Sequence, residues 1–408
     1  MKKLLTFVMA GGKGERLYPL TKDRAKPAVP FGGIYRIIDF TLSNCINSGI
    51  RRIHILVQYK SMSLSRHIRM GWNVLNSEVG EYIDALPAQQ RIDDHWYQGT
   101  ADAIYQNIYS IHSENPDQVL ILAGDHVYKM NYKLMLDTHR QSKADLTIGV
   151  VPMPAEEAPT VGVIEVDDQN NVVGFEEKPS VPKTVPGNPA YVYGSMGIYI
   201  FDRKVLEEEL YEDAKKNSTH DFGKDVIPQM IKKAQRKIVA YNFIDINNKE
   251  ALYWRDVGTL DAYFESNIDL IQVSPHFNLY DRDWPIRTYQ LQYPPAKFVF
   301  NQAFGGRRGT ALDSLVADGC IISGGLVQRS VLSPNVRVNS FAEVEDSLIL
   351  EGVDVGRYAK IRNAIIDKHA KIMPNATIGY NKELDAKRFT VTPKGIVVVE
   401  KGAVVEAV

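Results

Sequence analysis

The stretch FVMAGGKGERLYPLTKDRAKPAVPFGGIYRIIDF, residues Phe7–Phe40, says most about what this chain is. An apolar run from Leu4 to Met9 leads into a cluster of glycines, which predicts a buried strand that ends in a tight loop. Glycines at such a place let backbone N–H groups approach phosphate oxygens, because no Cβ stands in the way. The glycines are Gly11, Gly12 and Gly14.

Two common phosphate-binding motifs do not fit these glycines. A Walker loop requires GxxxxGK[ST], and a Rossmann fingerprint requires GxGxxG, in which Leu17 occupies the place of the third glycine. The glycines alone therefore leave phosphate binding and an ordinary turn equally open. Shortly downstream, Arg16 and Lys26 supply positive charge suited to a polyphosphate. Together these residues favour an enzyme that holds a nucleoside triphosphate and transfers part of it.

Length and composition limit the class of protein. The 408 residues are enough for two or three domains. A net charge of −1 and a pI of about 6.8 argue against nucleic acid or an anionic membrane as the main partner. The N-terminal lysines and apolar run mimic a signal peptide, but the run continues into GGKGER and is better explained as a first strand. No apolar stretch approaches the ~20 residues of a membrane span. Cys45 and Cys320 lie far apart in sequence, so we expect a reducing compartment, the cytoplasm.

Residues 1–275 alternate apolar strands with amphipathic helices. Strands are predicted at 53–57, 119–123 and 146–151, and helices at 100–112 and 134–141. This alternation indicates an α/β sheet that is covered on both faces. Ligands of such sheets bind at the carboxyl ends of the strands, where the glycine loop and Gly124-Asp125 fall.

The pattern changes after an irregular stretch rich in proline and glycine, residues 276–315, which we interpret as an interdomain connection. Residues 316–408 carry aliphatic side chains every six positions, with two five-residue steps. This period is typical of a parallel β-helix, in which each short strand stacks on the one before. A stackable surface of this kind favours oligomerisation or regulation as its task. The periodic residues are Leu326, Leu332, Val338, Val344, Leu350, Val355, Ile361, Ile366, Ile372 and Ile378.

Two carboxylates stand out in the first part of the chain. Asp125 ends the apolar run VLILAGD, where burial requires a cation or a polar ligand, although a helix N-cap is an equally good explanation. Asp256, in YWRDVGT, precedes a helix expected from Thr259. His126, beside Asp125, offers a general base or a metal ligand, a role to which we give little weight.

The Phe7–Phe40 stretch resembles the sugar-nucleotide pyrophosphorylases, whose signature is GGxGxRL followed about ten residues later by KP. Within that group, RAKPAVPFGG and RIIDFTLSNCINSGIRR resemble the glucose-1-phosphate adenylyltransferase family, and the resemblance covers almost all 408 residues. It implies a Rossmann-like nucleotidyltransferase domain with a mixed sheet, followed by a left-handed parallel β-helix. It also implies the reaction of ATP with glucose 1-phosphate to give ADP-glucose and pyrophosphate, with Mg²⁺, in glycogen or starch synthesis, by a homotetramer regulated by anionic metabolites.

The resemblance also assigns roles to individual residues. Family members use the matching Glu177-Lys178 pair for the sugar and its phosphate, whereas the residues alone would indicate a solvated turn. Gln90 and Trp96 match loop positions that couple regulation to catalysis. The implied catalytic residues are Arg16, Lys26 and Asp125, with Asp125 and Asp256 as metal ligands. The implied ATP-binding residues are Gly11, Gly12, Gly14, Gly99 and Thr100, and those for glucose 1-phosphate are Tyr97, Gly162, Glu177, Lys178 and Ser195.

One position departs from the family pattern. Members activated by fructose 1,6-bisphosphate carry a lysine where this chain has Asp23, which makes that activator doubtful. Arg24, Arg36 and Lys368 match other cations of the family's anionic effector site, and as plain residues they fit solvated surface charge equally well.

Three other functions stay open at this point. A uridylyl-, thymidylyl- or guanylyltransferase shares the fold, and a non-catalytic regulatory subunit would bind the same sugar phosphates. An acyltransferase built on the β-helix is disfavoured, because His369 is the only histidine of that segment.

Overall fold

The N-terminal apolar run forms strand β1 (Leu4–Met9) inside a nine-stranded sheet, as predicted. In the computed structural model, which describes residues 3–89, 95–244, 252–302 and 306–408, β1 lies parallel to β4 (Arg52–Val57) and β6 (Gln118–Ala123). Leu4 and Val8 face one apolar core, while Leu5 and Phe7 face another. The apolar residues of β1, which occupy every position except Thr6, therefore follow from burial on both faces.

The sheet is mixed, as the family resemblance implied. Its main path runs β10-β9-β11-β6-β1-β4-β5, and β8 pairs with β11 and with β12. Strands β4, β1 and β6 are parallel, whereas β11 runs antiparallel to β6, β8 and β9. The remaining strands are β5 (Tyr82–Pro87), β8 (Leu146–Pro154), β9 (Gly162–Val166), β10 (Val172–Glu177), β11 (Tyr191–Asp202) and β12 (Ile238–Asn242).

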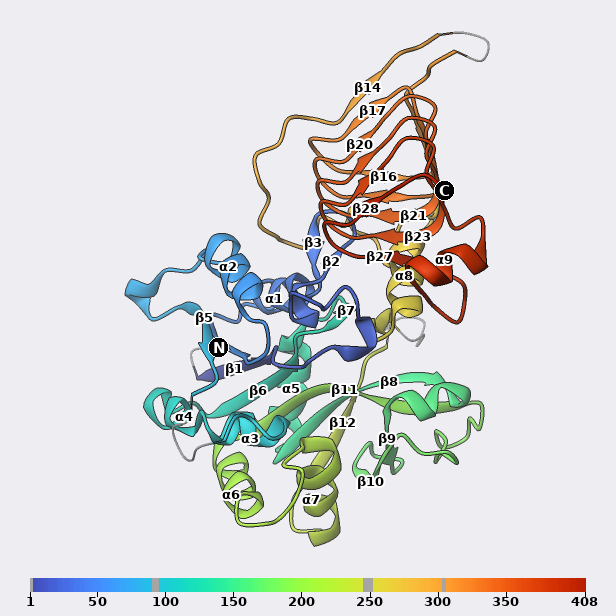
Figure 1. The fold of residues 1–408 in the computed structure, drawn as a ribbon. Coiled ribbons are helices and arrows are strands. Elements are labelled where there is room, and N and C mark those ends of the chain that lie inside the picture. The colour runs from blue at the N-terminus through green and yellow to red at the C-terminus, as the bar shows by residue number, and fades with distance from the viewer. Residues whose placement is uncertain (1–2, 90–94, 245–251, 303–305) are drawn as a thin grey trace.

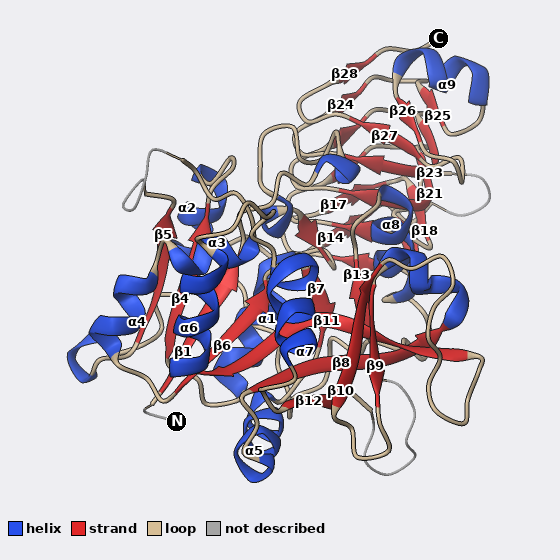
Figure 2. Ribbon diagram, turned by 90° about the horizontal axis from the view of Figure 1, so that it is seen from below, coloured by secondary structure: helices blue, strands red, loops and turns tan. Residues whose placement is uncertain are grey.

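Helices cover both faces of this sheet (Figures 1 and 2). One face packs against α1 (Ile37–Asn47), α2 (Met62–Gly71) and α5 (Tyr132–Ser142). The other packs against α3 (Thr100–Tyr105), α4 (Ile108–Glu114), α6 (Arg203–Asp213) and α7 (Ile227–Lys233). No helix of the described residues is both long and apolar enough to span a bilayer.

The single helix predicted at 100–112 is wrong, because two helices, α3 and α4, occupy this segment. The break falls at Asn107. Its side-chain amide donates to the carbonyl of Ala103 and to the hydroxyl of Tyr97, at 2.8 and 2.9 Å. Asparagine side chains that bond to nearby backbone compete with the helix and favour its interruption.

A short antiparallel ribbon crosses the carboxyl edge of the sheet. Strand β7 (His126–Tyr128) pairs with β13 (Trp254–Asp256) in a register that sets Asp256 opposite His126. After this ribbon, Thr259 caps α8 (Leu260–Asp269), because its side chain accepts the N–H of Ala262, as expected of a helix start.

The C-terminal part is a stack of parallel strands that matches the expected left-handed β-helix (Figure 1). In the middle of the stack neighbouring coils are 17 residues apart, as in the pairs Val338–Val355 and Val355–Ile372. The first stacked strand, β14 (Lys297–Val299), pairs with β17 (Ile321–Ser323), so stacking begins within the segment 276–315 that we assigned to the connection. The other strands are β15 (Thr310–Leu312), β16 (Leu315–Val316), β18 (Leu326–Gln328), β19 (Val331–Leu332), β20 (Arg337–Val338), β21 (Glu343–Ile349), β22 (Asp354–Val355), β23 (Lys360–Ile366), β24 (Lys371–Ile372), β25 (Thr377–Ile378), β26 (Thr390–Val391), β27 (Val397–Val399) and β28 (Val404–Val405), with helix α9 at Lys382–Arg388.

Eight of the ten predicted aliphatic positions lie in the β-helix core, but two predictions are wrong by one residue. Val327 and Ile349 point inward in place of Leu326 and Leu350. The reason is a five-residue side that recurs in three successive coils, between Val327 and Leu332, between Val344 and Ile349, and between Ile361 and Ile366. Each such side turns through a residue with positive φ, namely Arg329, Asp346 and Asn363.

One outer face of the β-helix docks on the first domain beside α8 (Figure 1). Its aliphatic side chains share an apolar cluster with Phe40, Tyr263 and Phe264. Ion pairs surround this contact, including Lys22 with Glu400 at 2.5 Å. The two parts therefore form one body. The docking side chains of the β-helix include Val331, Leu348, Leu350, Ile365, Ile396 and Val398.

Candidate active site

A single cleft of about 830 Å³ opens at the carboxyl ends of β1 and β6. All fourteen residues that the sequence assigned to catalysis, metal binding, ATP and glucose 1-phosphate line it. They come from segments between Gly11 and Asp256, so the fold brings together groups that are far apart in sequence. A cleft at this sheet edge is the usual ligand site of an α/β fold.

The glycine loop forms one wall of the cleft. Gly14 has a φ of 65°, in the left-handed region that favours glycine. A Cβ on Gly14 would lie 3.0 Å from the Cβ of Lys26, so the loop packs directly on the lysine segment. Thr21 closes the turn, since its hydroxyl donates to the carbonyl of Gly14 at 2.9 Å.

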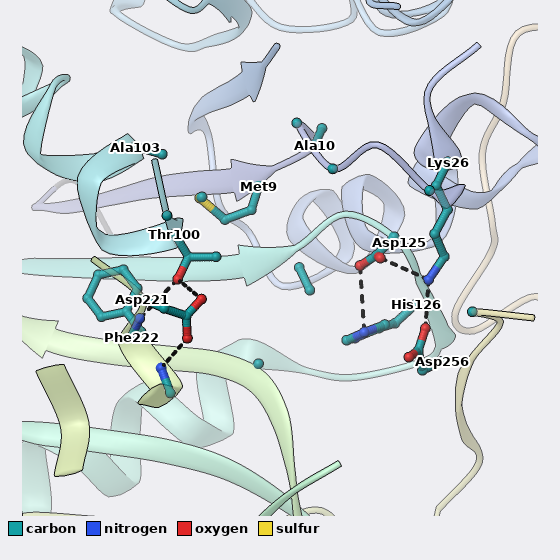
Figure 3. A pocket seen from close by; sticks show the side chains of 18 of the residues that line it. Met9, Ala10, Lys26, Thr100, Ala103, Asp125, His126, Asp221, Phe222 and Asp256 are labelled. Carbon is teal, nitrogen blue, oxygen red and sulfur yellow. Dashed lines mark hydrogen bonds and ion pairs between the residues drawn. The ribbon is translucent and has the colours of Figure 1, made fainter. Parts of the chain in front are cut away.

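The centre of the site is a buried lysine between two carboxylates (Figure 3). The Nζ of Lys26 lies 2.6 Å from Oδ1 of Asp256 and 2.9 Å from Oδ2 of Asp125. The Lys26 side chain is 7% exposed, whereas the Asp125 and Asp256 side chains are 32% and 27% exposed. The carboxylates therefore keep access to the cleft, and Arg16 approaches Asp256 from the same side at 3.8 Å.

The pKa values follow from this arrangement. Burial raises the pKa of Asp125, but the charge of Lys26, the neighbouring His126 and the hydrogen bond from Lys26 outweigh it and hold this pKa at about 2. Burial lowers the pKa of Lys26, and the two carboxylates outweigh that effect and raise the pKa above 10.5. Asp125 and Lys26 are therefore both charged at neutral pH.

The same carboxylates are a candidate metal site. Ligand atoms of Asp125, His126 and Asp256 all lie within 4.8 Å of one another. Two carboxylate oxygens are a donor set that suits a hard divalent cation, and the Lys26 ammonium already places positive charge between them. The residues therefore fit a divalent metal. Asp125 is not a helix N-cap, because strand β7 and not a helix follows it.

The far side of the cleft carries the expected sugar-phosphate residues. A Cβ on Gly162 would lie 2.7 Å from Cζ of Phe175 and 3.0 Å from Oε2 of Glu177, so glycine at this position makes room for both side chains. The Nζ of Lys178 lies 3.7 Å from Oε1 of Glu177. Lys178 has a φ of 52°, an unusual conformation for lysine that is held by its N–H bond to Val161. Ser195 stands at an irregular point of β11 in the same wall.

The Gly99-Thr100-Ala101 turn makes contacts within the protein that its sequence did not reveal. We expected backbone N–H groups at this helix start, or the Thr100 hydroxyl, to meet the nucleotide. Instead, the N–H groups of Ala101 and Asp102 donate to the carbonyl of His220. The Thr100 hydroxyl donates to Asp221 and accepts the N–H of Phe222, both at 3.0 Å. These groups therefore serve the protein's own structure, although Gly99 and Thr100 do line the cleft.

Tyr97 also lines the cleft, and its hydroxyl accepts from Asn107 at 2.9 Å. Of the two loop positions, Trp96 is 57% exposed, and Gln90 lies outside the described residues.

Sequence reasoning missed several lining residues. Asp221, Phe222 and Trp254 line the cleft, and His126 stacks edge-on against Trp254 with ring centroids 4.9 Å apart. The sequence offered one sign of Asp221, which is its position directly before Phe222-Gly223. In the structure its side chain accepts hydrogen bonds from the two backbone N–H groups of Gly223 and Lys224. Nothing local distinguishes that turn from an ordinary helix cap.

The three cations of the possible effector site meet at the interface between the two domains. Arg24 forms a buried ion pair with Asp367, and Lys368 lies 2.6 Å from Glu351. Arg36 donates to the carbonyl and hydroxyl of Ser63. Burial lowers the pKa of Lys368, against the pull of Glu351, and the charges of Arg36 and Arg24 lower it further. The solvated surface expected of these residues alone is therefore wrong.

Comparison with known proteins agrees with this geometry. Residues 5–273 match the family model of the nucleotidyl transferases, and residues 294–399 match that of the GlmU-like C-terminal hexapeptide domain. Fold and cleft thus define the chain as a nucleotidyltransferase with a hexapeptide-repeat domain. A glucose-1-phosphate adenylyltransferase of Koribacter versatilis is 57% identical over 98% of this chain and 96% of its own length. Those of Rhodopirellula baltica and an Anaeromyxobacter species are 53% and 50% identical, over 99% and 100% of this chain and 91% and 100% of their own lengths. The chain belongs to the glucose-1-phosphate adenylyltransferase family.

Proposed function

We propose that this protein transfers the adenylyl group of ATP to glucose 1-phosphate and releases pyrophosphate. The observation that carries the proposal is the single cleft with two charged ends. At one end the glycine loop, Arg16 and Lys26 suit a triphosphate, and at the other Glu177 and Lys178 suit a sugar phosphate. The product, ADP-glucose, would supply glucosyl units for glycogen or starch.

The reaction needs positioning and charge neutralisation more than proton transfer. The attacking group is a phosphate oxygen of glucose 1-phosphate, which is ionised at neutral pH and requires no general base. It forms a bond to the α-phosphorus of ATP while the bond to the pyrophosphate oxygen breaks. Lys178 would orient the attacking phosphate, and Arg16 and Lys26 would stabilise the charge that develops on the leaving pyrophosphate.

We assign Mg²⁺ to Asp125 and Asp256, with His126 beside them. Mg²⁺ takes one or two carboxylates together with waters and phosphate oxygens, which matches the two partly exposed carboxylates of the cleft. When bound, the ion supplies charge neutralisation to the phosphates. In its absence Lys26 supplies the positive charge between the carboxylates.

We further propose that anionic metabolites bind at Arg24, Arg36 and Lys368, and that the protein acts as a cytoplasmic homotetramer. The support for the effector site is the meeting of three cations from both domains at one interface. The internal partners Asp367 and Glu351 neutralise two of them, so an anion must compete with these carboxylates. Titration of the protein with inorganic phosphate, compared with the Lys368→Gln variant, tests the site.

The proposed reaction is tested by pyrophosphate release from the purified chain with glucose 1-phosphate, MgCl₂ and one nucleotide at a time. We expect ATP to support turnover at least tenfold better than UTP, dTTP or GTP. A higher rate with another nucleotide would change the assignment of the base. No turnover with any of them would favour a regulatory subunit.

A further inference from the structure

One segment behind the cleft contacts both substrate regions, and His220 lies at its centre. The carbonyl oxygen of His220 accepts the N–H groups of Ala101 and Asp102, at 2.8 and 3.2 Å. The chain approaches so closely here that a Cβ on Gly99 would lie 2.2 Å from this oxygen. The segment around His220 therefore determines where the Gly99-Thr100 turn stands.

The residues after His220 extend this contact to the sugar side. Asp221 accepts from the Thr100 hydroxyl with one oxygen and from the N–H groups of Gly223 and Lys224 with the other. A Cβ on Gly223 would lie 3.5 Å from Oε2 of Glu177. Residues 220–223 thus connect the Gly99-Thr100 turn, which lines the cleft, with the carboxylate assigned to the sugar. Figure 3 shows the contact between Thr100 and Asp221.

The conformation of His220 itself is held from behind the cleft. His220 has a φ of 54°, which is strained for a residue with a side chain. Its Nδ1 lies 2.7 Å from Oδ2 of Asp213, whose side chain is only 6% exposed. Ser218 donates to the other oxygen of Asp213 and accepts the N–H of His220. Neither Asp213 nor His220 is among the residues that line the cleft.

These three residues do not form a hydrolytic triad. The oxygens of Ser218 and Asp213 both contact the same nitrogen of His220, Nδ1, whereas a proton relay needs both ring nitrogens. Their role is therefore structural or positional.

We propose that His220, held by Asp213, is a positioning residue that sets the distance between the nucleotide and sugar-phosphate regions. The inference rests on the proposed function. Substrates reach each other only if both regions are correctly spaced, and an error of 1 Å can reduce the rate by about 10²-fold. Binding of each substrate alone depends on contacts within its own region.

The test compares His220→Ala with His220→Asn. Asparagine tolerates positive φ and can place an amide N–H near Nδ1, so it preserves both features that alanine loses. We expect His220→Ala to lower kcat about 10- to 100-fold, while the Kd of ATP and of glucose 1-phosphate, each titrated alone, changes less than about threefold. His220→Asn should recover most of the lost kcat.

The matched control is His112→Ala, which removes another histidine–carboxylate pair, with Glu207 at 3.5 Å, on the surface. It should leave kcat unchanged. The inference fails if His220→Ala turns over within twofold of wild type, if only the substrate affinities fall, or if alanine and asparagine reduce kcat and Tm equally. If His220→Ala does not fold, Asp213→Asn decides by the same criteria. Wild-type turnover with ATP and glucose 1-phosphate, measured alongside, reports separately on the proposed function.

Discussion

Lys26 lies where a metal ion would balance the charges of Asp125 and Asp256. Removal of the lysine side-chain charge should therefore make the stability of the protein depend on Mg²⁺. The Lys26→Met variant keeps an unbranched apolar chain but leaves the two carboxylates without their cation. Their ligand atoms lie within 4.8 Å of each other. At that distance two unit charges repel by about 1 kcal/mol in water and about 3.5 kcal/mol at an intermediate dielectric.

The expected decrease in the free energy of unfolding follows from this repulsion and from the loss of two charge-assisted hydrogen bonds. Breaking a buried pair costs about 3–5 kcal/mol, but these carboxylates are about a third exposed, so we expect about 2–4 kcal/mol. Mg²⁺ at 100 times its Kd adds about 2.7 kcal/mol to a protein that binds it only when folded. Mg²⁺ should therefore restore most of the stability that Lys26→Met loses. It should stabilise the wild type less, because there the ion competes with the Lys26 ammonium group.

Thermal unfolding with and without MgCl₂, at constant ionic strength, measures this effect as a shift of Tm of about 1 °C per kcal/mol for a chain of 408 residues. Lys22→Met is the control, because Lys22 pairs with Glu400 on the surface, where such pairs contribute little. The reasoning is refuted if Lys26→Met unfolds at the wild-type temperature, or if Mg²⁺ stabilises variant and wild type equally.

Four further predictions concern activity and pH. Asp125→Asn should reduce kcat about 10²- to 10³-fold with little change in Tm. The control is Asp281→Asn, which changes a similarly exposed partner of a lysine and should leave kcat unchanged; steady-state kinetics of both variants tests this. Lys178→Ala should raise KM for glucose 1-phosphate roughly ten- to a hundredfold and leave KM for ATP nearly unchanged, with Lys183→Ala as control; a change in the ATP constant instead would move Lys178 to the nucleotide. Fructose 1,6-bisphosphate should activate weakly, because Asp23 is negative; strong activation at micromolar concentration, unaffected by Asp23→Lys, would contradict this. The stabilisation from Asp125, whose pKa is depressed to about 2, should be complete above pH ~4 and lost between pH ~4 and ~2. Acid titrations of unfolding should therefore show that the stability of Asp125→Asn changes less with pH in this range than the stability of the wild type.

Local patterns in the sequence were sufficient for the elements themselves. The apolar run before Gly11 predicted β1 with its bounds, because a strand buried on both faces needs apolar residues at successive positions. The six-residue period predicted the β-helix, because each side of a coil points one side chain inward. It missed the two positions at Leu326 and Leu350, because the side chain next to each of them, Val327 or Ile349, points inward in its place. Aliphatic neighbours at both places hide that choice from the sequence.

The site required long-range pairing that no local pattern contains. Asp125 and Asp256 came together as a candidate metal site only through the register of β7 on β13. The sequence marked Lys26 as a cation for a phosphate, but not as the residue that separates these two carboxylates. The Thr100 hydroxyl looked free for a ligand until the fold placed Asp221 beside it. Strand propensity and periodicity depend on residues that are neighbours in the chain. These contacts depend instead on which distant groups come within hydrogen-bond distance, and the tertiary structure decides which groups do so.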